Sequence, residues 1–188
     1  MLYQFLKDML NILRLRYRAP MEYLYTLPVI TAVLLLLGVI NAASMSSLFG
    51  QHPAAIMFAV LLTVVKWLVL SRAMRAVIHY YGGAPRLPLW GFTLASEALG
   101  IPILALFYVP QLASVALFYQ VWIFWVQAIG FMKMGNISGW KIMLGYALYL
   151  LGTLATGSVL LILFIQAGWM DADMLNQQLQ TIMQLKEF

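Results

Sequence analysis

Two charged residues interrupt apolar stretches of the sequence. Lys66 lies within LLTVVKWLVLSR (residues 61–72), and Glu97 lies in another apolar run that begins after Pro88. A charge at the centre of a membrane-spanning helix costs roughly 2.5–3.5 kcal/mol on insertion scales, so such residues usually face the protein interior or a water-filled cavity. Lys66 and Glu97 are therefore the first candidates for a functional site.

Three interpretations of this candidate pair remain open. Lys66 lies six residues before Arg72, or about 9 Å along a helix, so its ammonium could extend to the cytoplasmic interface. Glu97 lies nine residues after Pro88, or about 13 Å from the same side, so the two charges could instead pair between neighbouring helices. The third interpretation is a carrier site. We rank it last because no other ionisable residue lies at membrane depth and no span shows the mid-membrane break of a carrier.

Two glutamines in FYQVWIFWVQ (residues 118–127) are the next candidates. Gln120 and Gln127 are seven residues apart and therefore share one face of a helix, with Trp122 and Trp125 nearby. Amides and aromatic rings together can line a ligand cavity. Polar side chains in membranes also hydrogen-bond to neighbouring helices, each bond contributing roughly 0.6–2 kcal/mol. We favour this packing role for the two glutamines.

The sequence lacks the signatures of enzyme active sites. It contains no cysteine, which excludes thiolate metal sites and cysteine nucleophiles, and its two histidines, His52 and His79, have no metal-ligand spacing. No predicted span holds paired aspartates, a serine with a histidine or an HExxH motif, and no P-loop is present. We therefore expect a protein that is not an enzyme and binds no cofactor or metal.

The composition indicates an integral membrane protein. Hydrophobic residues make up 64% of the chain and charged residues only 9%, with a mean hydropathy of +0.90. Soluble domains are about one quarter charged. Several stretches approach the roughly 18 apolar residues that a membrane-spanning helix requires. We predict an all-α polytopic transmembrane bundle of five helices, near residues 25–43, 54–71, 88–109, 113–132 and 142–167.

Basic residues alternate between the predicted loops. The N-terminal segment and the second and fourth loops are basic, whereas the first and third loops hold no lysine or arginine. The basic residues concerned are Lys7, Arg14, Arg16, Arg18, Arg72, Arg75, Arg86, Lys133 and Lys141. The positive-inside rule predicts a cytoplasmic N-terminus and an external C-terminus, as for a multi-pass protein of the bacterial inner membrane. The net charge of +5 follows from this topology and does not indicate nucleic-acid binding.

Both ends of the chain are predicted to form amphipathic helices at the membrane surface, flanking a transmembrane domain at residues 25–169. In residues 1–24 the apolar side chains share one helical face, and Lys7 and Arg14 lie on the other; the apolar residues are Leu2, Phe5, Leu6, Met9, Leu10 and Leu13. Residues 170–188 repeat the pattern, with Asp171 or Asp173 as N-cap. Each helix could lie on lipid or contact a partner protein.

Glycine and proline positions suggest a family. A basic amphipathic segment (residues 11–23) precedes the first span, Gly82 and Gly83 follow the second, and Pro102 lies in the third. Together with residues 125–148, this layout resembles the Yip (Ypt-interacting protein) family of five-span membrane proteins, most closely its bacterial type. The bacterial relatives have no generally assigned biochemical role, so the resemblance implies the five-span layout and no particular activity. Eukaryotic members are linked to small GTPases, but the long N-terminal extension common in them is lacking here, so we do not expect GTPase binding.

Two functions therefore remain. The leading hypothesis is a scaffold or accessory subunit that binds other membrane proteins or a second copy of itself, or organises the lipid bilayer. The alternative is a small carrier, or a subunit of a transport complex, with a cavity formed by Lys66, Glu97, Gln120 and Gln127. Convergence of these side chains would favour the carrier, and lipid-facing positions would count against it.

Overall fold

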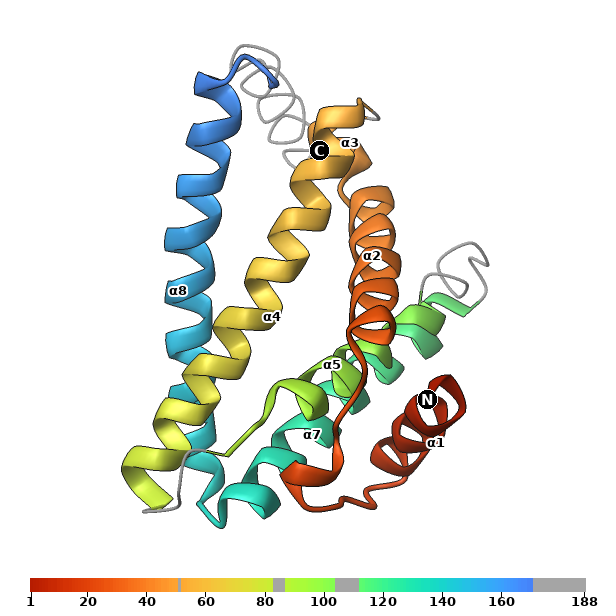
Figure 1. Ribbon diagram of the computed structural model, residues 1–188, viewed down its shortest axis with the longest axis vertical. Coiled ribbons are helices and arrows are strands. Elements are labelled where there is room, and N and C mark those ends of the chain that lie inside the picture. The colour runs from red at the N-terminus through yellow and green to blue at the C-terminus, as the bar shows by residue number, and fades with distance from the viewer. Residues whose placement is uncertain (51, 83–86, 104–111, 171–188) are drawn as a thin grey trace.

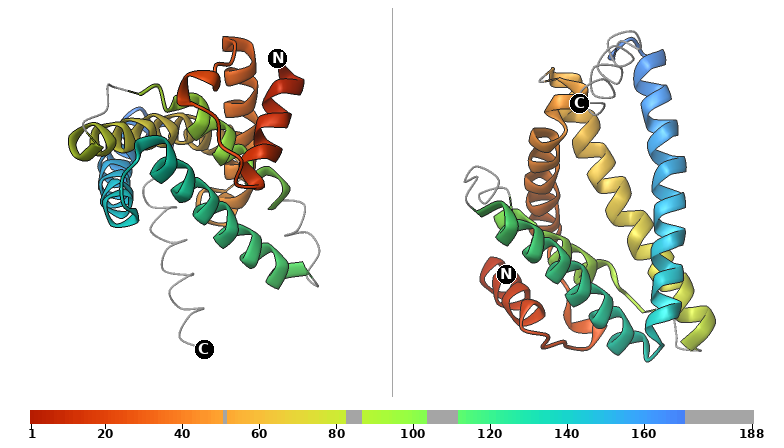
Figure 2. Two further views of the ribbon diagram at one scale, coloured as in Figure 1. Left: turned by 90° about the horizontal axis from the view of Figure 1, so that it is seen from below. Right: turned by 180° about the vertical axis from the view of Figure 1, so that it is seen from behind.

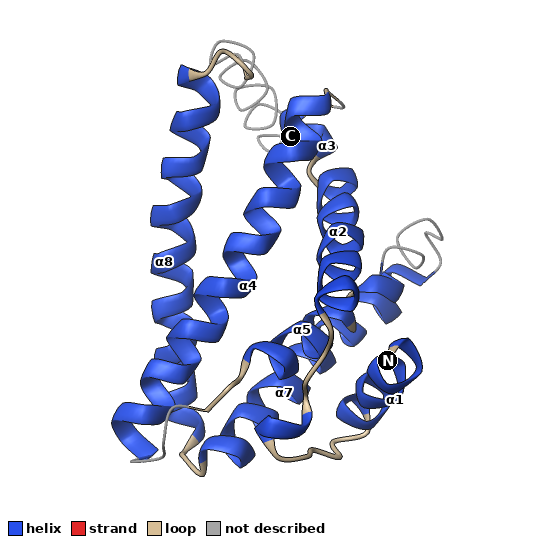
Figure 3. Ribbon diagram, in the orientation of Figure 1, coloured by secondary structure: helices blue, strands red, loops and turns tan. Residues whose placement is uncertain are grey.

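The computed structural model describes residues 1–50, 52–82, 87–103 and 112–170, and these ranges contain helices and no strand (Figures 1 and 3). The predicted all-α class is confirmed. The elements are α1 (Leu2–Leu13), the 3₁₀ helix η1 (Pro20–Glu22), α2 (Leu27–Ser44), α3 (Ser46–Phe49), α4 (Pro53–Gly82), α5 (Trp90–Ala98), α7 (Ala113–Gly135) and α8 (Gly139–Gln166).

Four of the described helices are long and apolar enough to cross a membrane, namely α2, α4, α7 and α8. They match the first, second, fourth and fifth predicted spans. Helix α4 continues to Gly82, well past the predicted end at residue 71, because Met74, Val77 and Ile78 extend its buried face while Arg72 remains exposed.

The third predicted span, residues 88–109, is described only as far as residue 103. It contains α5, a turn at residues 99–100 and a further helical segment at residues 101–103. Residues 104–109 lie outside the described residues, and so does the predicted C-terminal helix from residue 171 onward.

The helices form two groups. Helix α4 runs between α2 and α8 and packs extensively against both (Figure 1). Helices α5 and α7 lie side by side and cross this group obliquely, as the view from below and the view from behind show (Figure 2). Helix α1 packs on α5 and α7. The site described below lies where the two groups meet.

Glycines allow α8 to approach α4 closely. A Cβ atom at Gly145 would lie 2.7 Å from Sδ of Met74, and one at Gly152 would lie 2.8 Å from Cγ1 of Val69. Small residues at such positions increase van der Waals contact between membrane helices. The α4–α8 pair is therefore a tightly packed support for the rest of the bundle.

The basic segments come together at one end of the molecule, the lower end in Figure 1. Nζ of Lys141 lies 5.1 Å from the ring centroid of Tyr81, and Nζ of Lys133 lies 5.3 Å from that of Tyr17. Cations over aromatic rings gain roughly 0.5–1 kcal/mol at exposed sites. The ends of α4 and α7, the start of α8 and the segment after α1 thus share one side.

Helix α1 divides its apolar residues between two environments. Phe5 and Ile12 are buried against the bundle, whereas Leu2, Leu6 and Leu10 are exposed. The predicted single apolar face therefore does not lie wholly on lipid, because part of it packs on the chain's own α5 and α7.

Asp8 anchors α1 to the start of α2. Its side chain is fully buried and accepts hydrogen bonds from Gln4 Nε2 (3.0 Å) and Tyr25 Oη (3.2 Å). Nη1 of Arg18 lies 3.5 Å from Oδ1 of Asp8. A buried carboxylate is stable only when paired and hydrogen-bonded, so this network holds α1 in place.

Tyr17 makes a second connection, because its hydroxyl donates to the carbonyl of Val126 in α7 (2.7 Å). Burial raises the pKa of Tyr17, which keeps the hydroxyl protonated as a donor.

Candidate functional site

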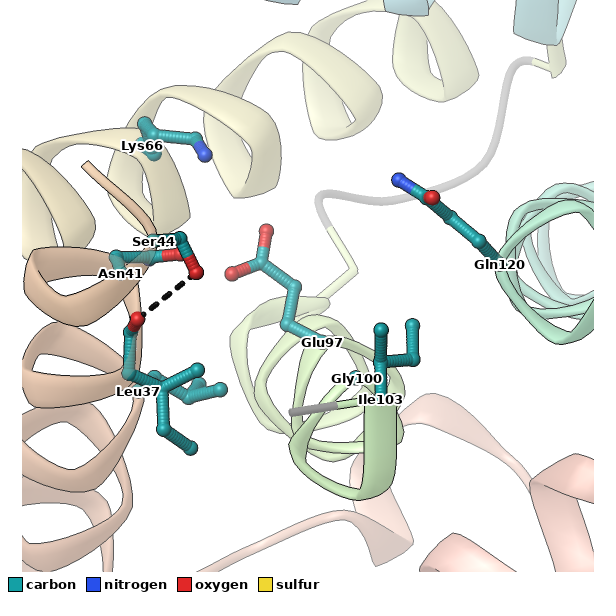
Figure 4. A pocket seen from close by; sticks show the side chains of 9 residues that line it. Leu37, Asn41, Ser44, Lys66, Glu97, Gly100, Ile103 and Gln120 are labelled. Carbon is teal, nitrogen blue, oxygen red and sulfur yellow. Dashed lines mark hydrogen bonds between the residues drawn. The ribbon is translucent and has the colours of Figure 1, made fainter. Parts of the chain in front are cut away.

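A cavity of about 280 Å³ lies between α2, α4, α5 and α7 (Figure 4). Polar side chains from all four helices line it. They are Asn41 and Ser44 of α2, Lys66 of α4, Glu97 of α5 and Gln120 of α7. Leu37, Ile40, Gly100 and Ile103 also line it. The structure thus brings together three of the four side chains proposed for a carrier cavity.

Trp67 fixes the orientation of Lys66. Its indole is buried, and Nε1 donates to the carbonyl of Trp90 at the start of α5 (3.0 Å). Successive residues on a helix point about 100° apart, so anchoring Trp67 against α5 also sets the direction of Lys66. The ammonium of Lys66 extends from α4 toward the cavity (Figure 4).

Ser96 similarly fixes the orientation of Glu97. The Ser96 hydroxyl is buried, donates to the carbonyl of Thr93 (3.0 Å) and accepts from Nε2 of Gln127 (2.8 Å). These bonds hold one side of α5 against α7. The carboxylate of Glu97 leaves the helix on another side and points toward α2 and α4 (Figure 4).

Lys66 and Glu97 face the same cavity without forming a salt bridge. No nitrogen–oxygen distance between them falls within 4.0 Å, and neither side chain hydrogen-bonds to another residue in the described part of the chain. Both side chains are half-buried. The direct clip between two helices, one of the three interpretations of this pair, is therefore not formed, and the ammonium of Lys66 faces the cavity (Figure 4).

The helix that carries Glu97 is interrupted directly after it. Helix α5 ends at Ala98, residues 99–100 form a turn, and residues 101–103 are helical again. The amide of Gly100 donates to the carbonyl of Glu97 (2.9 Å), which is the tighter i to i−3 spacing. Pro102 has no amide hydrogen, so the carbonyl of Ala98 lacks its usual i+4 donor.

The sequence predicts no break in the third span, yet a turn at residues 99–100 follows α5 within the residues of that predicted span. The available signal was a glycine two residues before a proline in LGIP (residues 99–102), a combination that favours interruption of a helix.

The two glutamines of α7 have different roles. Gln127 is buried and joins three helices, since it donates to Ser96 of α5 and accepts from the hydroxyl of Tyr146 in α8 (2.8 Å). Gln120 lies about 10 Å farther along the helix, is exposed and lines the cavity. They share a helical face, but α7 crosses its neighbours obliquely, so only Gln127 lies at the contact.

Helix α2 contributes to the cavity in a way that was not predicted from the sequence. Asn41 donates from Nδ2 to Oγ1 of Thr63 in α4 (2.8 Å), and Thr63 in turn donates to the carbonyl of Ala59 (2.8 Å). These bonds fix the amide of Asn41 at the edge of the cavity. In the sequence, this contribution of α2 is indicated by the polar residues Asn41 and Ser44 at the end of a largely apolar span.

Gly82 and Pro102, two of the positions on which the family resemblance rests, have structural explanations. A Cβ atom at Gly82 would lie 2.9 Å from the carbonyl oxygen of Gly135, so the glycine lets the end of α4 approach the turn between α7 and α8. Pro102 is exposed and lies beside the break after α5. Gly83 lies outside the described residues.

Comparison with protein-family models, with curated proteins and with solved structures found no match to this chain. The resemblance to the Yip family therefore stays a prediction. Within residues 1–50, 52–82, 87–103 and 112–170, no three histidine, aspartate or glutamate side chains gather closely enough to hold a metal ion.

Proposed function

We propose that this chain is a small membrane carrier, or a carrier subunit of a transport complex, that binds a small polar solute in the cavity between α2, α4, α5 and α7. The observation that carries the proposal is the position of Glu97, which lines the cavity directly before a break in its own helix. Discontinuous helices that present backbone and charged groups to a central site are typical of secondary transporters.

The cavity residues have complementary roles in this proposal. Lys66 and Glu97 bind charged groups of the solute, and neither must first give up a salt bridge to the other. Asn41 and Gln120 supply amides that both donate and accept hydrogen bonds. The interrupted helix lets the α5–α7 pair move against the α2–α4–α8 group, which is the better packed of the two.

The membrane topology that goes with this function has five spans, with the N-terminus in the cytoplasm and the C-terminus outside an inner membrane. Its support is the grouping of Lys133, Lys141 and the segment after α1 at one end of the molecule. In this topology α5 and residues 101–103 begin the third span, and the third predicted loop follows it.

A scaffold or accessory subunit is the second candidate, and α8 favours it. This helix packs mainly on α4, and most of its surface is exposed and apolar, including Leu151, Leu154 and Ile162. Such a surface suits lipid, a second copy of the chain or another membrane protein. Cross-linking of Leu151→Cys in native membranes distinguishes these cases, since a partner gives an adduct of defined mass and lipid gives none.

Transport is tested with the purified full-length chain in two steps. Amino acids, organic acids, amines, sugars and nucleosides are first screened for an increase in unfolding temperature, and a stabilising solute is then radiolabelled for uptake into proteoliposomes. We expect uptake by the wild type, with a decrease of about tenfold or more in Lys66→Met and Glu97→Gln, because each loses a charge-assisted contact.

The matched controls are Lys7→Met and Glu22→Gln, which make the same chemical changes at exposed positions away from the cavity. Both should transport like the wild type. Uptake that is equally fast in Lys66→Met and in the wild type would contradict the proposal, and so would the absence of any stabilising solute.

A further inference from the structure

We propose that the solute is a small zwitterion that carries one ammonium group and one carboxylate or phosphate group. This inference rests on the proposed function and names the chemical class that the same cavity selects. Free amino acids and the ethanolamine headgroup of a phospholipid share this chemistry, and the experiment below separates the two sources.

The first argument is the arrangement of charge. Lys66 offers a cation from α4 and Glu97 an anion from α5, and both extend into the same cavity (Figure 4). Neither has a salt-bridge or hydrogen-bond partner in the described ranges. Charges that make no direct contact with a counter-charge or hydrogen-bond partner are costly inside a membrane protein, and a ligand with both complementary charges satisfies them together.

The second argument is the net charge of the cavity. The formal charges of Lys66 and Glu97 cancel, and the other lining side chains among the described residues are uncharged. A simple anion that binds Lys66 is repelled by Glu97, and a simple cation that binds Glu97 is repelled by Lys66. A neutral molecule with separated charges meets no such repulsion.

The third argument is size and polarity. The volume of about 280 Å³ is at the small end of ligand pockets, which are roughly 300–1,000 Å³. Asn41 and Gln120 can hydrogen-bond to the polar end of a ligand, while Leu37 and Ile103 provide apolar wall for a short side chain. A small amino acid or a single headgroup fits these dimensions.

The test measures how the unfolding temperature depends on ligand concentration, with the full chain in phosphatidylcholine nanodiscs. The probes are alanine, propionate, ethylamine and betaine, the last being a zwitterion without N–H donors. For the wild type and Lys7→Met we expect alanine to bind about ten- to a hundredfold more tightly than propionate or ethylamine, because each of those lacks one charge-assisted contact. Betaine should also bind more weakly than alanine.

The variants should invert this preference, which a general loss of structure would not do. Lys66→Met leaves a net negative cavity that should favour ethylamine, and Glu97→Gln leaves a net positive cavity that should favour propionate. If either variant fails to fold, Gln120→Leu replaces it, because this exposed residue makes no hydrogen bond within the described ranges and lines the cavity. It should weaken alanine binding severalfold at an unchanged unfolding temperature without ligand.

A second arm replaces part of the phosphatidylcholine with phosphatidylethanolamine. If the natural ligand is a headgroup, this lipid should stabilise the wild type more than Glu97→Gln and should compete with alanine. If the natural ligand is a free amino acid, the lipid should have no such effect.

The outcomes separate the zwitterion class from the carrier proposal. Stabilisation by a singly charged or uncharged solute, dependent on Lys66 and Glu97, would overturn the zwitterion class and leave the carrier standing. If neither a solute nor phosphatidylethanolamine stabilises the wild type, both proposals fail.

Discussion

Lys66 of α4 and Glu97 of α5 line one cavity, yet no nitrogen–oxygen distance between them is short enough for a salt bridge. Opposite charges at similar membrane depth would ordinarily be expected to pair directly. Here hydrogen bonds of their neighbours, Trp67 and Ser96, set the rotation of each helix. The separation leaves both charges available to a ligand.

A double-mutant cycle on this pair should therefore show weak coupling. We expect Lys66→Met and Glu97→Gln to combine almost additively, with a coupling free energy below about 1 kcal/mol, because the charges are not in contact. The measurement is the free energy of unfolding in mixed detergent micelles. Breaking a buried salt bridge costs roughly 3–5 kcal/mol. A coupling free energy of that size would show that Lys66 and Glu97 form a direct salt bridge after all.

The two glutamines of α7 should differ in their importance for stability. Gln127→Leu removes hydrogen bonds to Ser96 and Tyr146 and should lower the free energy of unfolding by about 1–3 kcal/mol. Gln120→Leu is the matched control, with the same substitution on the same helix at an exposed position, and should change stability by less than about 0.5 kcal/mol. Equal losses in the two variants would show that the interhelical bonds of Gln127 contribute little.

Asp8 should control the docking of α1. Asp8→Asn removes the charge opposite Arg18 and disturbs the acceptor for Tyr25, so we expect a loss of about 2–3 kcal/mol. Trypsin should then cleave faster after Arg14 and Arg16, which follow the loosened helix. In Glu22→Gln, whose carboxylate is exposed and 4.0 Å from Arg18, cleavage should stay at the wild-type rate. Unchanged cleavage in Asp8→Asn would mean that apolar contacts alone dock α1.

The topology can be read from single cysteines, because the natural sequence contains none. We expect a membrane-impermeant maleimide to label His52→Cys and Trp169→Cys in intact cells, since both positions are exposed and the contact of Phe58 with Phe164 places them at one end of the bundle. Ser138→Cys, at the opposite end, should react only after permeabilisation. The reverse pattern would invert the proposed orientation, and different labelling of His52→Cys and Trp169→Cys would contradict this placement.

The sequence by itself determined the helical class and most of the membrane helices. Hydropathy is a local property, so the apolar runs that became α2, α4, α7 and α8 were evident without any contact information. It also singled out Lys66 and Glu97, because charges are rare in such runs. Their neighbours along the chain, however, do not reveal whether they pair.

Only the tertiary structure decided which polar groups meet. Asn41 entered the cavity because α2 packs on α4, and Gln127 left the candidate site because α7 crosses α5 and α8 at that point. The positions of Tyr25 and Arg18 around Asp8 likewise follow from tertiary packing and not from the sequence of α1. Crossing angles and helix rotations depend on the packing of many side chains at once, so residue types and spacings along one helix do not determine them.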